Sequence, residues 1–346
     1  KWLTDEGTTI DMAADEMLSK VTAISDYAFA EHREITSVTL PKGLKKMGKC
    51  AFKSCSKLTS IVIPEGITSI EEGSFVFCEG LTSVTIPGSV TSVGYAAFSQ
   101  CTNLAKITIP DKGLVTIGER AFSCPALKSF TIPTTVTSIG KDAFFNCQKL
   151  TSLVIPTTVR SIGEGAFRNC KAITSIVIPK GITKIEDSTF MNCEALTSVT
   201  IPNTVTSIGS GAFSSCKSLP SIAIPNTVTN IGESAFSLCS ALKSFTFPDN
   251  NSITSIEEKT FLAAGLTSIT IPNTVKSIGN NAFAECPALN SVTLKGGTPP
   301  TINIDSWPGT FSDTPLNAIY VPANSVETYK KADGWNKFAD KIQAIK

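Results

Sequence analysis

Phenylalanine recurs along this chain at a nearly fixed interval, and no other feature limits the possible folds as strongly. The aligned residues are Phe29, Phe52, Phe75, Phe98, Phe122, Phe144, Phe167, Phe190, Phe213, Phe236, Phe261 and Phe283. Most intervals are 23 residues, and the long intervals before Phe122 and Phe261 are each followed by a short one. A repeat of this size cannot bury its own apolar side, whereas stacked repeats share one continuous core. The spacing therefore predicts a solenoid.

Each repeat contains two short segments with the pattern of extended chain. In one representative repeat, Ile176 and Ile178 alternate with Ser175 and Val177, which is the period of a strand with one buried face. A second short extended segment is expected over 182–185, and no part of the repeat is long enough for a convincing helix. We therefore predict a predominantly β solenoid of about 12 rungs with a parallel strand ladder.

The full pattern is Phe-x-x-Cys-x-x-Leu-x-x-Ile-x-Ile-Pro-x-x-Val-x-x-Ile-Gly-x-x-Ala-Phe, and the segment CSKLTSIVIPEGITSIEEGSF from Cys55 to Phe75 shows it cleanly. This pattern resembles the BspA-like, Treponema pallidum-type leucine-rich repeat over about 21–294. The resemblance implies a right-handed leucine-rich-repeat superhelix. The segment after residue 295 also resembles the ends of such proteins from gut and oral Bacteroidetes. The resemblance therefore implies a cell-surface or secreted protein of a host-associated bacterium, acting as a non-enzymatic adhesin.

The two ends of the chain depart from the repeat and are expected to cover the exposed ends of the core. We predict an N-terminal cap over 1–20, formed by a short helix or irregular chain, and repeats over 21–294. Residues 295–346 are predicted to form a degenerate last rung and then a helical cap. Asn324 or Ser325 could cap the start of that helix, and we expect Trp335 to pack on the last rung.

Ten of the eleven cysteines occupy one position of the repeat, and Cys50 is the exception. Neighbouring rungs would hold these side chains parallel at about 4.8 Å, while a disulfide needs Cβ atoms about 3.8 Å apart. A single-file column cannot surround a zinc ion, and His32, the single histidine, could approach at most the first thiols. We interpret the column as small buried side chains, with disulfides as the alternative.

Composition and motifs exclude several classes of function. The formal net charge of +1 disfavours nucleic acid as a partner, since phosphate binding needs a clustered basic excess. No apolar run reaches the roughly 20 residues of a membrane span, and any export signal would lie outside this sequence. No phosphate-binding loop, histidine-based nucleophile or paired-carboxylate motif stands out. We therefore expect no catalytic residue, metal site or cofactor. We also expect the protein to be a monomer.

Outward positions of the first strand form two columns of small residues, mostly Ser in one and Thr or Val in the other. We predict that they recognise an extracellular protein or glycan; alternatively, small β-formers simply suit a crowded face. A remote alternative is an ice-binding array. Glycan binding would use exposed aromatic rings, and the candidates for this role are Phe77, Phe145, Tyr95 and Trp307. The candidate binding residues are Ser129, Thr131, Ser152, Val154, Ser175, Val177, Ser198, Thr200, Phe77 and Phe145.

Overall fold

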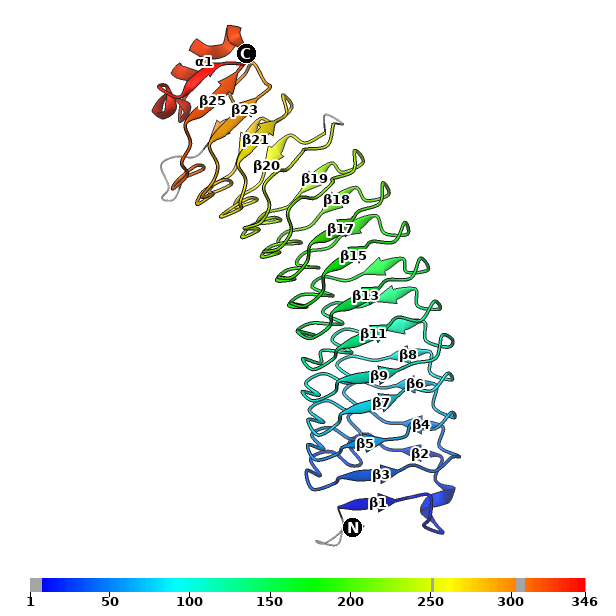
Figure 1. Cartoon of the computed structure of the whole chain (residues 1–346). Helices are drawn as coiled ribbons and strands as arrows, with labels where there is room; N and C mark the ends of the chain where they lie inside the picture. The colour runs from blue at the N-terminus through cyan, green and yellow to red at the C-terminus, as the bar shows by residue number, and fades with distance from the viewer. Residues whose placement is uncertain (1–7, 250–251, 303–308, 346) are drawn as a thin grey trace. The chain divides into compact units, whose positions relative to one another are not determined.

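The computed structural model describes residues 8–249, 252–302 and 309–345, and its chain forms two compact units. Unit 1 is Lys1–Ile173 and unit 2 is Thr174–Lys346. Both units are stacks of β-solenoid turns, as Figure 1 shows, and each is treated separately below. The solenoid fold with parallel strands and repeats of about 23 residues confirms the predicted fold class.

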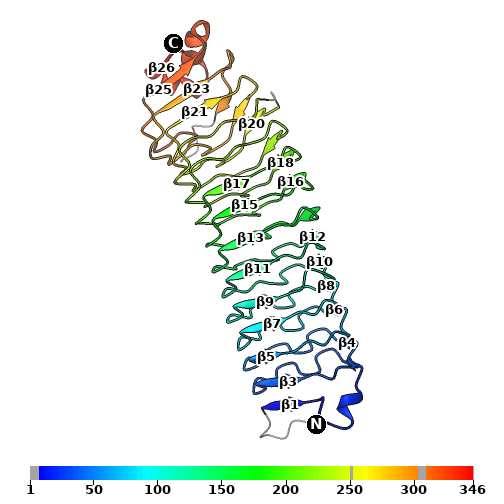
Figure 2. The ribbon, with the colours of Figure 1, turned by 45° about the vertical axis from the view of Figure 1, so that its right-hand side comes forward.

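Unit 1 holds two columns of short strands, one on each side of its core (Figure 2). The first column contains β1 (Thr9–Asp11), β3 (Ser37–Thr39), β5 (Ser60–Ile61), β7 (Ser83–Thr85), β9 (Lys106–Thr108), β11 (Ser129–Thr131) and β13 (Ser152–Val154). The second contains β2 (Ala23–Ile24), β4 (Lys46–Met47), β6 (Ser69–Ile70), β8 (Ser92–Val93), β10 (Thr116–Ile117), β12 (Ser138–Ile139) and β14 (Ser161–Ile162), and one 3-10 turn, η1, covers Leu18–Lys20. The paired strands of unit 1 are parallel, and equivalent residues of the repeat lie side by side. Outward side chains therefore form straight rows.

Unit 2 continues the same pattern but with an interruption. Its first column contains β15 (Ser175–Val177), β17 (Ser198–Thr200), β21 (Ser268–Ile271), β23 (Ser291–Leu294), β25 (Ala318–Val321) and β26 (Ile342–Ala344). Its second column contains β16 (Lys184–Ile185), β18 (Ser207–Ile208), β19 (Asn230–Ile231), β20 (Ser255–Ile256), β22 (Ser277–Ile278) and β24 (Thr301–Ile302). The chain at 221–223 and 244–246 forms no strand, although it carries the repeat pattern.

Pro220 gives a physical reason for this interruption. In the preceding turn the equivalent residue is Thr197, whose amide donates to the carbonyl of Thr174 at 2.8 Å. Proline has no amide hydrogen, so it cannot make the corresponding bond to the turn before it. The strand pattern therefore lapses at this point of the first column.

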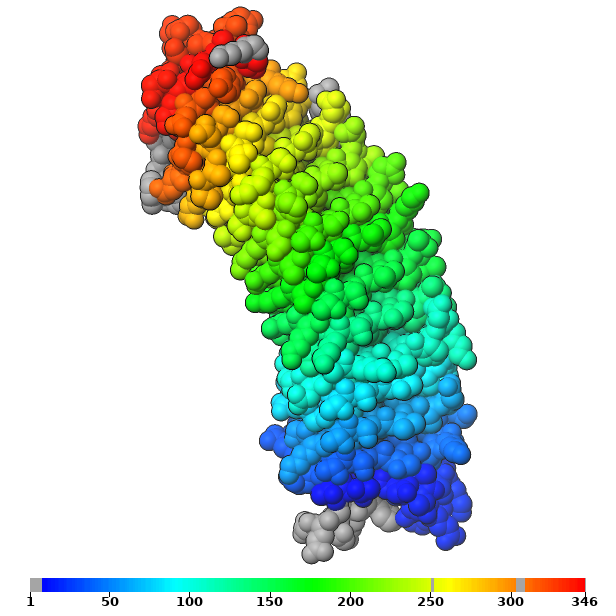
Figure 3. All heavy atoms as spheres, in the orientation of Figure 1, coloured from blue at the N-terminus to red at the C-terminus, as the bar shows by residue number. Residues whose placement is uncertain are grey.

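The core of each unit is a file of stacked phenylalanine rings. In unit 1 the rings from Phe29 to Phe167 follow one another with centroids 5.0–5.8 Å apart. In unit 2 the rings from Phe190 to Phe311 are 5.4–5.7 Å apart. Figure 3 shows rows of surface atoms that run across each unit and pack against one another. The spacing of phenylalanine in the sequence is thus the spacing of the turns.

Next to each core phenylalanine of unit 1, one residue of the turn adopts the left-handed backbone conformation, with a positive φ. The residue two positions before the ring has a φ of 50–60° throughout unit 1, and we call this set the left-handed column of unit 1: Tyr27, Cys50, Gly73, Ala96, Arg120, Asp142 and Gly165. A left-handed conformation costs a non-glycine residue about 1–2 kcal/mol. Hydrogen bonds between turns satisfy the backbone here; for example, the Gly73 amide donates to the Tyr95 carbonyl at 2.8 Å.

In the N-terminal segment, residues 12–20 form turns and η1, which agrees with the predicted helical or irregular cap, whereas residues 9–11 differ from it. Residues 9–11 form β1, which pairs with β3 so that Ile10 lies beside Val38. Thr9, Ile10 and Asp11 alternate in polarity as the repeat strands do, so they extend the ladder by one turn. This turn and the one that carries Phe311 bring the solenoid to about 14 turns instead of 12.

The predicted helical cap forms over 323–338, but the prediction is wrong for the last residues of the chain, which form a strand. After η2 (Ala323–Ser325) come α1 (Val326–Lys331) and η3 (Trp335–Phe338), but Ile342–Ala344 forms β26 and pairs with β25. An open strand edge at β25 attracts this last segment, whose Ile342 is buried. Ser325 stands at the N-cap position yet makes no capping bond, so the predicted cap is also wrong.

Two aromatic side chains fasten the C-terminal segment to the end of the stack. Trp335 is fully buried, with its ring 6.0 Å from that of Phe311, and its Nε1 donates to the Pro300 carbonyl at 2.7 Å. The Tyr329 hydroxyl donates to the Gly296 carbonyl at 2.8 Å. The expected packing of Trp335 on the last rung is confirmed.

Candidate functional site

The outward side chains of the first strand column form an exposed surface, which we call the strand face. In unit 1, Ser129 and Thr131 on β11 lie directly beside Ser152 and Val154 on β13. All four are exposed, and Val154 has 76% of its surface accessible. Lys106 on β9 is the neighbouring charged residue in the serine row. The strand face of unit 1 is therefore a nearly uncharged surface of hydroxyl and methyl groups.

The same arrangement recurs in unit 2. Ser175 lies beside Ser198, and Val177 beside Thr200, on the paired strands β15 and β17. All four are exposed, Val177 to 64%. The structure thus places eight of the sequence-predicted binding residues on strand faces, four in each unit.

Sequence reasoning missed a hollow in unit 2, beside the lapse in the strands. It has a volume of about 360 Å³ and is lined by Phe245, Thr246, Phe247, Pro248, Asp249, Thr270, Pro272, Asn273 and Lys295. Phe247 was the available signal, because the other repeats carry isoleucine or leucine at its position; the longer interval after Pro248 was a second signal.

The aromatic candidates fall into two groups. Phe77 and Tyr95 are 44% and 46% exposed and line one open hollow of about 430 Å³ in unit 1. Phe145 is half-buried, and the Arg168 guanidinium lies 4.6 Å from the centre of its ring. Trp307 lies outside the described residues. Of the described aromatic candidates, Phe77 and Tyr95 therefore share a site, while Phe145 is covered by a cation.

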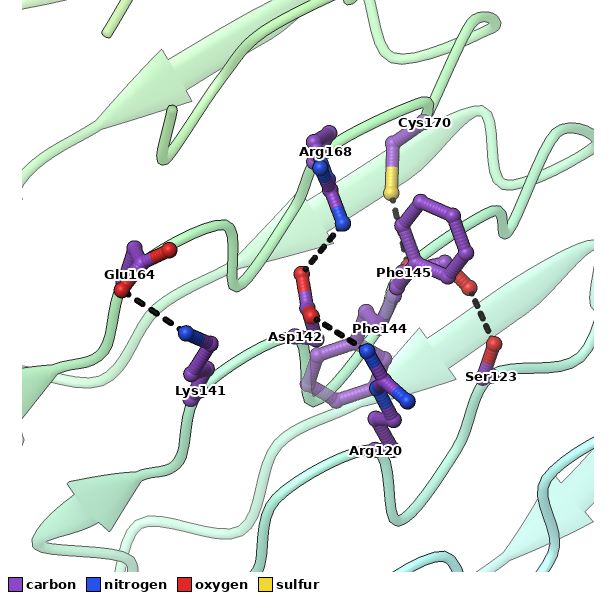
Figure 4. Close-up of polar contacts among 9 residues, drawn as sticks. All are labelled: Arg120, Ser123, Lys141, Asp142, Phe144, Phe145, Glu164, Arg168 and Cys170. Carbon is purple, nitrogen blue, oxygen red and sulfur yellow. Dashed lines mark hydrogen bonds and ion pairs between the residues drawn. The ribbon is translucent and has the colours of Figure 1, made fainter. Parts of the chain in front are cut away.

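A buried carboxylate joins two arginines next to that hollow (Figure 4). Asp142 is only 2% exposed, and its two oxygens lie 3.4 Å from Arg120 Nη2 and 3.2 Å from Arg168 Nη2. Beside this cluster, Lys141 pairs with Glu164 at 2.9 Å. A buried carboxylate needs compensation by opposite charge, and the two guanidinium groups provide it for Asp142. Arg120 also lines the hollow that contains Phe77 and Tyr95.

The repeated cysteines are packed inside the turns. Their Sγ atoms donate to the carbonyl of the core phenylalanine one turn earlier, as Cys101 does to Phe75 at 3.1 Å. Burial raises the pKa of Cys101 and Cys239 to about 12. Throughout the described chain the cysteines are thiols rather than disulfides, which agrees with the packing interpretation. Cys50 alone is half-buried, and it lines the unit 1 hollow.

Comparison with known proteins agrees with this architecture. A family model described as the BspA type leucine rich repeat region matches residues 22–151, 115–219, 137–264 and 206–332. The chain belongs to the BspA-type leucine-rich repeat family. A leucine rich cell surface protein from Faecalibacterium prausnitzii A2-165 is 32% identical to this BspA-type chain, with a TM-score of 0.53. The match covers 80% of this chain and 83% of the Faecalibacterium chain. A leucine-rich repeat protein from Eubacterium ventriosum is 23% identical, with 77% and 85% coverage and a TM-score of 0.51. No curated protein sequence matches the chain significantly.

Two further observations concern the described residues of this BspA-type protein. Among them, no helix has the length and apolar character needed to cross a membrane. In the same ranges, His, Cys, Asp and Glu side chains form no cluster of three or more that could hold a metal ion.

Thiol labelling is expected to distinguish Cys50 from the column. In the folded BspA-type protein at about pH 8, one thiol should react quickly, because the buried thiols are protonated and inaccessible. Labelling in denaturant without reductant should reach eleven thiols. The Cys50→Ser variant should lose the fast reaction. A count near one in denaturant would instead show that the column is oxidised.

Proposed function

We propose that this chain is a non-enzymatic adhesin, displayed on or secreted from a host-associated bacterial cell, that binds an extracellular protein through its strand face as a monomer. The observation that supports this proposal is the strand face itself, because its paired strands expose valine beside small hydroxyl side chains. Such a surface loses little hydration energy when it is covered, so a flat partner can approach closely. The family and the cell-surface description of the Faecalibacterium relative support the location.

Lysine substitutions on the strand face test this function. The double variants Thr131→Lys/Val154→Lys and Val177→Lys/Thr200→Lys place long charged groups on units 1 and 2 respectively. We expect binding to immobilised fibrinogen, laminin or collagen to weaken at least about 10-fold, which corresponds to about 1.4 kcal/mol. The loss arises because each ammonium group must be desolvated when the partner covers it. Surface plasmon resonance measures the effect.

The matched controls are Thr157→Lys and Asn203→Lys, which add the same charge at exposed turn residues away from the strand face. These variants should bind as the parent protein does. The proposal fails if the parent binds none of the three proteins at micromolar concentration, or if strand-face and turn variants weaken binding equally. Thermal hysteresis of the parent protein would point to an ice-binding array instead.

A further inference from the structure

The hollow in unit 1 results from two small residues in the left-handed column. Gly73 and Ala96 stand between Cys50 and Arg120 in that column, and all four line the hollow. Neither small residue carries a side chain beyond Cβ, so space is left between two larger neighbours. Its volume of about 430 Å³ falls within the range of small-ligand pockets.

Aromatic residues flank this space at positions where other turns of unit 1 carry polar residues. At the position of Phe77, other turns of unit 1 have residues such as Gln100 and Asn146, and at the position of Tyr95 they have charged residues such as Glu72 and Lys141. Both substitutions to an aromatic side chain occur beside Gly73 and Ala96, and both rings remain about half exposed. Aromatic faces in an open hollow suit the C–H faces of a pyranose ring, and aromatic residues frequently anchor ligands in this way.

The polar groups of the hollow favour a negative charge on that ligand. Arg120 lines the hollow, and its Nη2 lies 3.4 Å from Oδ2 of the buried Asp142. Lys53 also lines the hollow. Glu72 is the one lining carboxylate, and it is already paired with Lys49 at 3.0 Å. A planar guanidinium is well suited to a carboxylate.

We propose that this hollow binds an acidic saccharide, with a pyranose ring against Phe77 and Tyr95, one carboxylate against Arg120 and another against Lys53 at the opposite end of the hollow. The site lies on the turn side of unit 1, built from residues that do not belong to the strand face. It therefore adds a glycan-binding activity that stands independently of the proposed protein binding.

Isothermal titration with trigalacturonic acid tests the charge requirement. Its fully methyl-esterified form is a matched control, because it keeps the size and ring shape but lacks the carboxylates. The acid should bind with a dissociation constant at or below the millimolar range, and the ester at least about 10-fold more weakly. Higher salt should also weaken binding of the acid. No binding of the acid at about 5 mM, or equal binding of acid and ester, would overturn the proposal.

Side-chain variants test the location of the site. Phe77→Asn keeps a residue that tolerates the left-handed backbone, and Tyr95→Ser copies Ser210 at the equivalent position. Each should weaken binding at least about 10-fold. Arg120→Lys retains the charge beside Asp142 but removes the planar fork, so it too should weaken binding. Unchanged affinity in Phe77→Asn and Tyr95→Ser would exclude this hollow.

Leu238→Asn is the matched control for Phe77→Asn. Leu238 has the same position in its repeat, a φ of 60° and 46% exposure, but it lies in unit 2. Its variant should bind trigalacturonic acid as the parent does, and so should Thr131→Lys/Val154→Lys on the strand face. Since Cys50 lines the hollow, the acid should also slow Cys50 labelling. Labelling that is unaffected at saturating acid would contradict the assignment.

Discussion

Phe213→Ala is expected to lower the free energy of unfolding by about 3–5 kcal/mol. The Phe213 ring is fully buried, with its centroid 5.4 Å from that of Phe190 and 5.7 Å from that of Phe236. The backbone of each turn is hydrogen-bonded to the next, so the neighbouring rings cannot close the gap. The variant therefore loses the burial of the ring and retains a cavity. Urea unfolding followed by circular dichroism measures the change.

Phe213→Leu provides the control for this prediction, because it keeps an apolar side chain and leaves a smaller cavity. It should cost clearly less than the alanine variant. In a solenoid, each turn is stabilised mainly by its nearest neighbours. The alanine variant should therefore also broaden the unfolding transition or split it. A loss below about 1 kcal/mol with an unchanged transition would show that the stacked rings contribute little.

The regular part of the fold could be predicted from the sequence because one side-chain pattern determines both the strand and the stacking. The alternation around Ile176 and Ile178 predicts which residues face the core, and Ser175 and Val177 are indeed exposed on β15. The period of phenylalanine predicts the turn spacing, since each ring needs the next ring to bury its face. These signals recur in every repeat, so a single departure does not hide them.

Features that depend on backbone geometry could not be predicted in the same way. The left-handed column accepts residues as different as Tyr27, Arg120 and Asp142, so glycine does not mark it. The hollow in unit 1 arises because Gly73 and Ala96 are adjacent in space while 23 residues apart in sequence. Phe77 and Tyr95 stood out individually as departures from the repeat. Only the stacking of turns shows that they share one site.

β26 illustrates a further limit of sequence reasoning. Its sequence follows a helical segment without a strong turn signal, and by itself it suits a helix as well as a strand. The deciding factor is the open edge of β25, which offers backbone hydrogen bonds to the last segment of the chain. That edge exists only once the preceding turns have stacked.

Alkaline conditions are expected to destabilise this protein steeply, beginning near pH 9. Burial raises the pKa of Cys55, Cys101, Cys239 and Cys286 to about 12, from an ordinary value of 9.0. Between these values the unfolded chain loses the thiol protons while the folded chain keeps them. The unfolded state then binds fewer protons, so the free energy of unfolding falls as pH rises. Each such thiol contributes about 1.4 kcal/mol per pH unit, and these four together about 5 kcal/mol per unit.

Urea unfolding at intervals from about pH 8 to 10, in the presence of reductant, measures this slope. The control is the double variant Cys101→Ala/Cys239→Ala, because alanine already occupies the equivalent position at the fully buried Ala264. From pH 8 to 10 its free energy of unfolding should fall less than that of the parent, by about 1.4 kcal/mol in total for each thiol removed. An identical slope in the parent and the double variant would mean that the thiols are not the groups that titrate. A flat profile through pH 10 would mean that the column is not held as buried thiols. Thiols that stay protonated in the core but ionise in the unfolded chain must lower the free energy of unfolding above about pH 9.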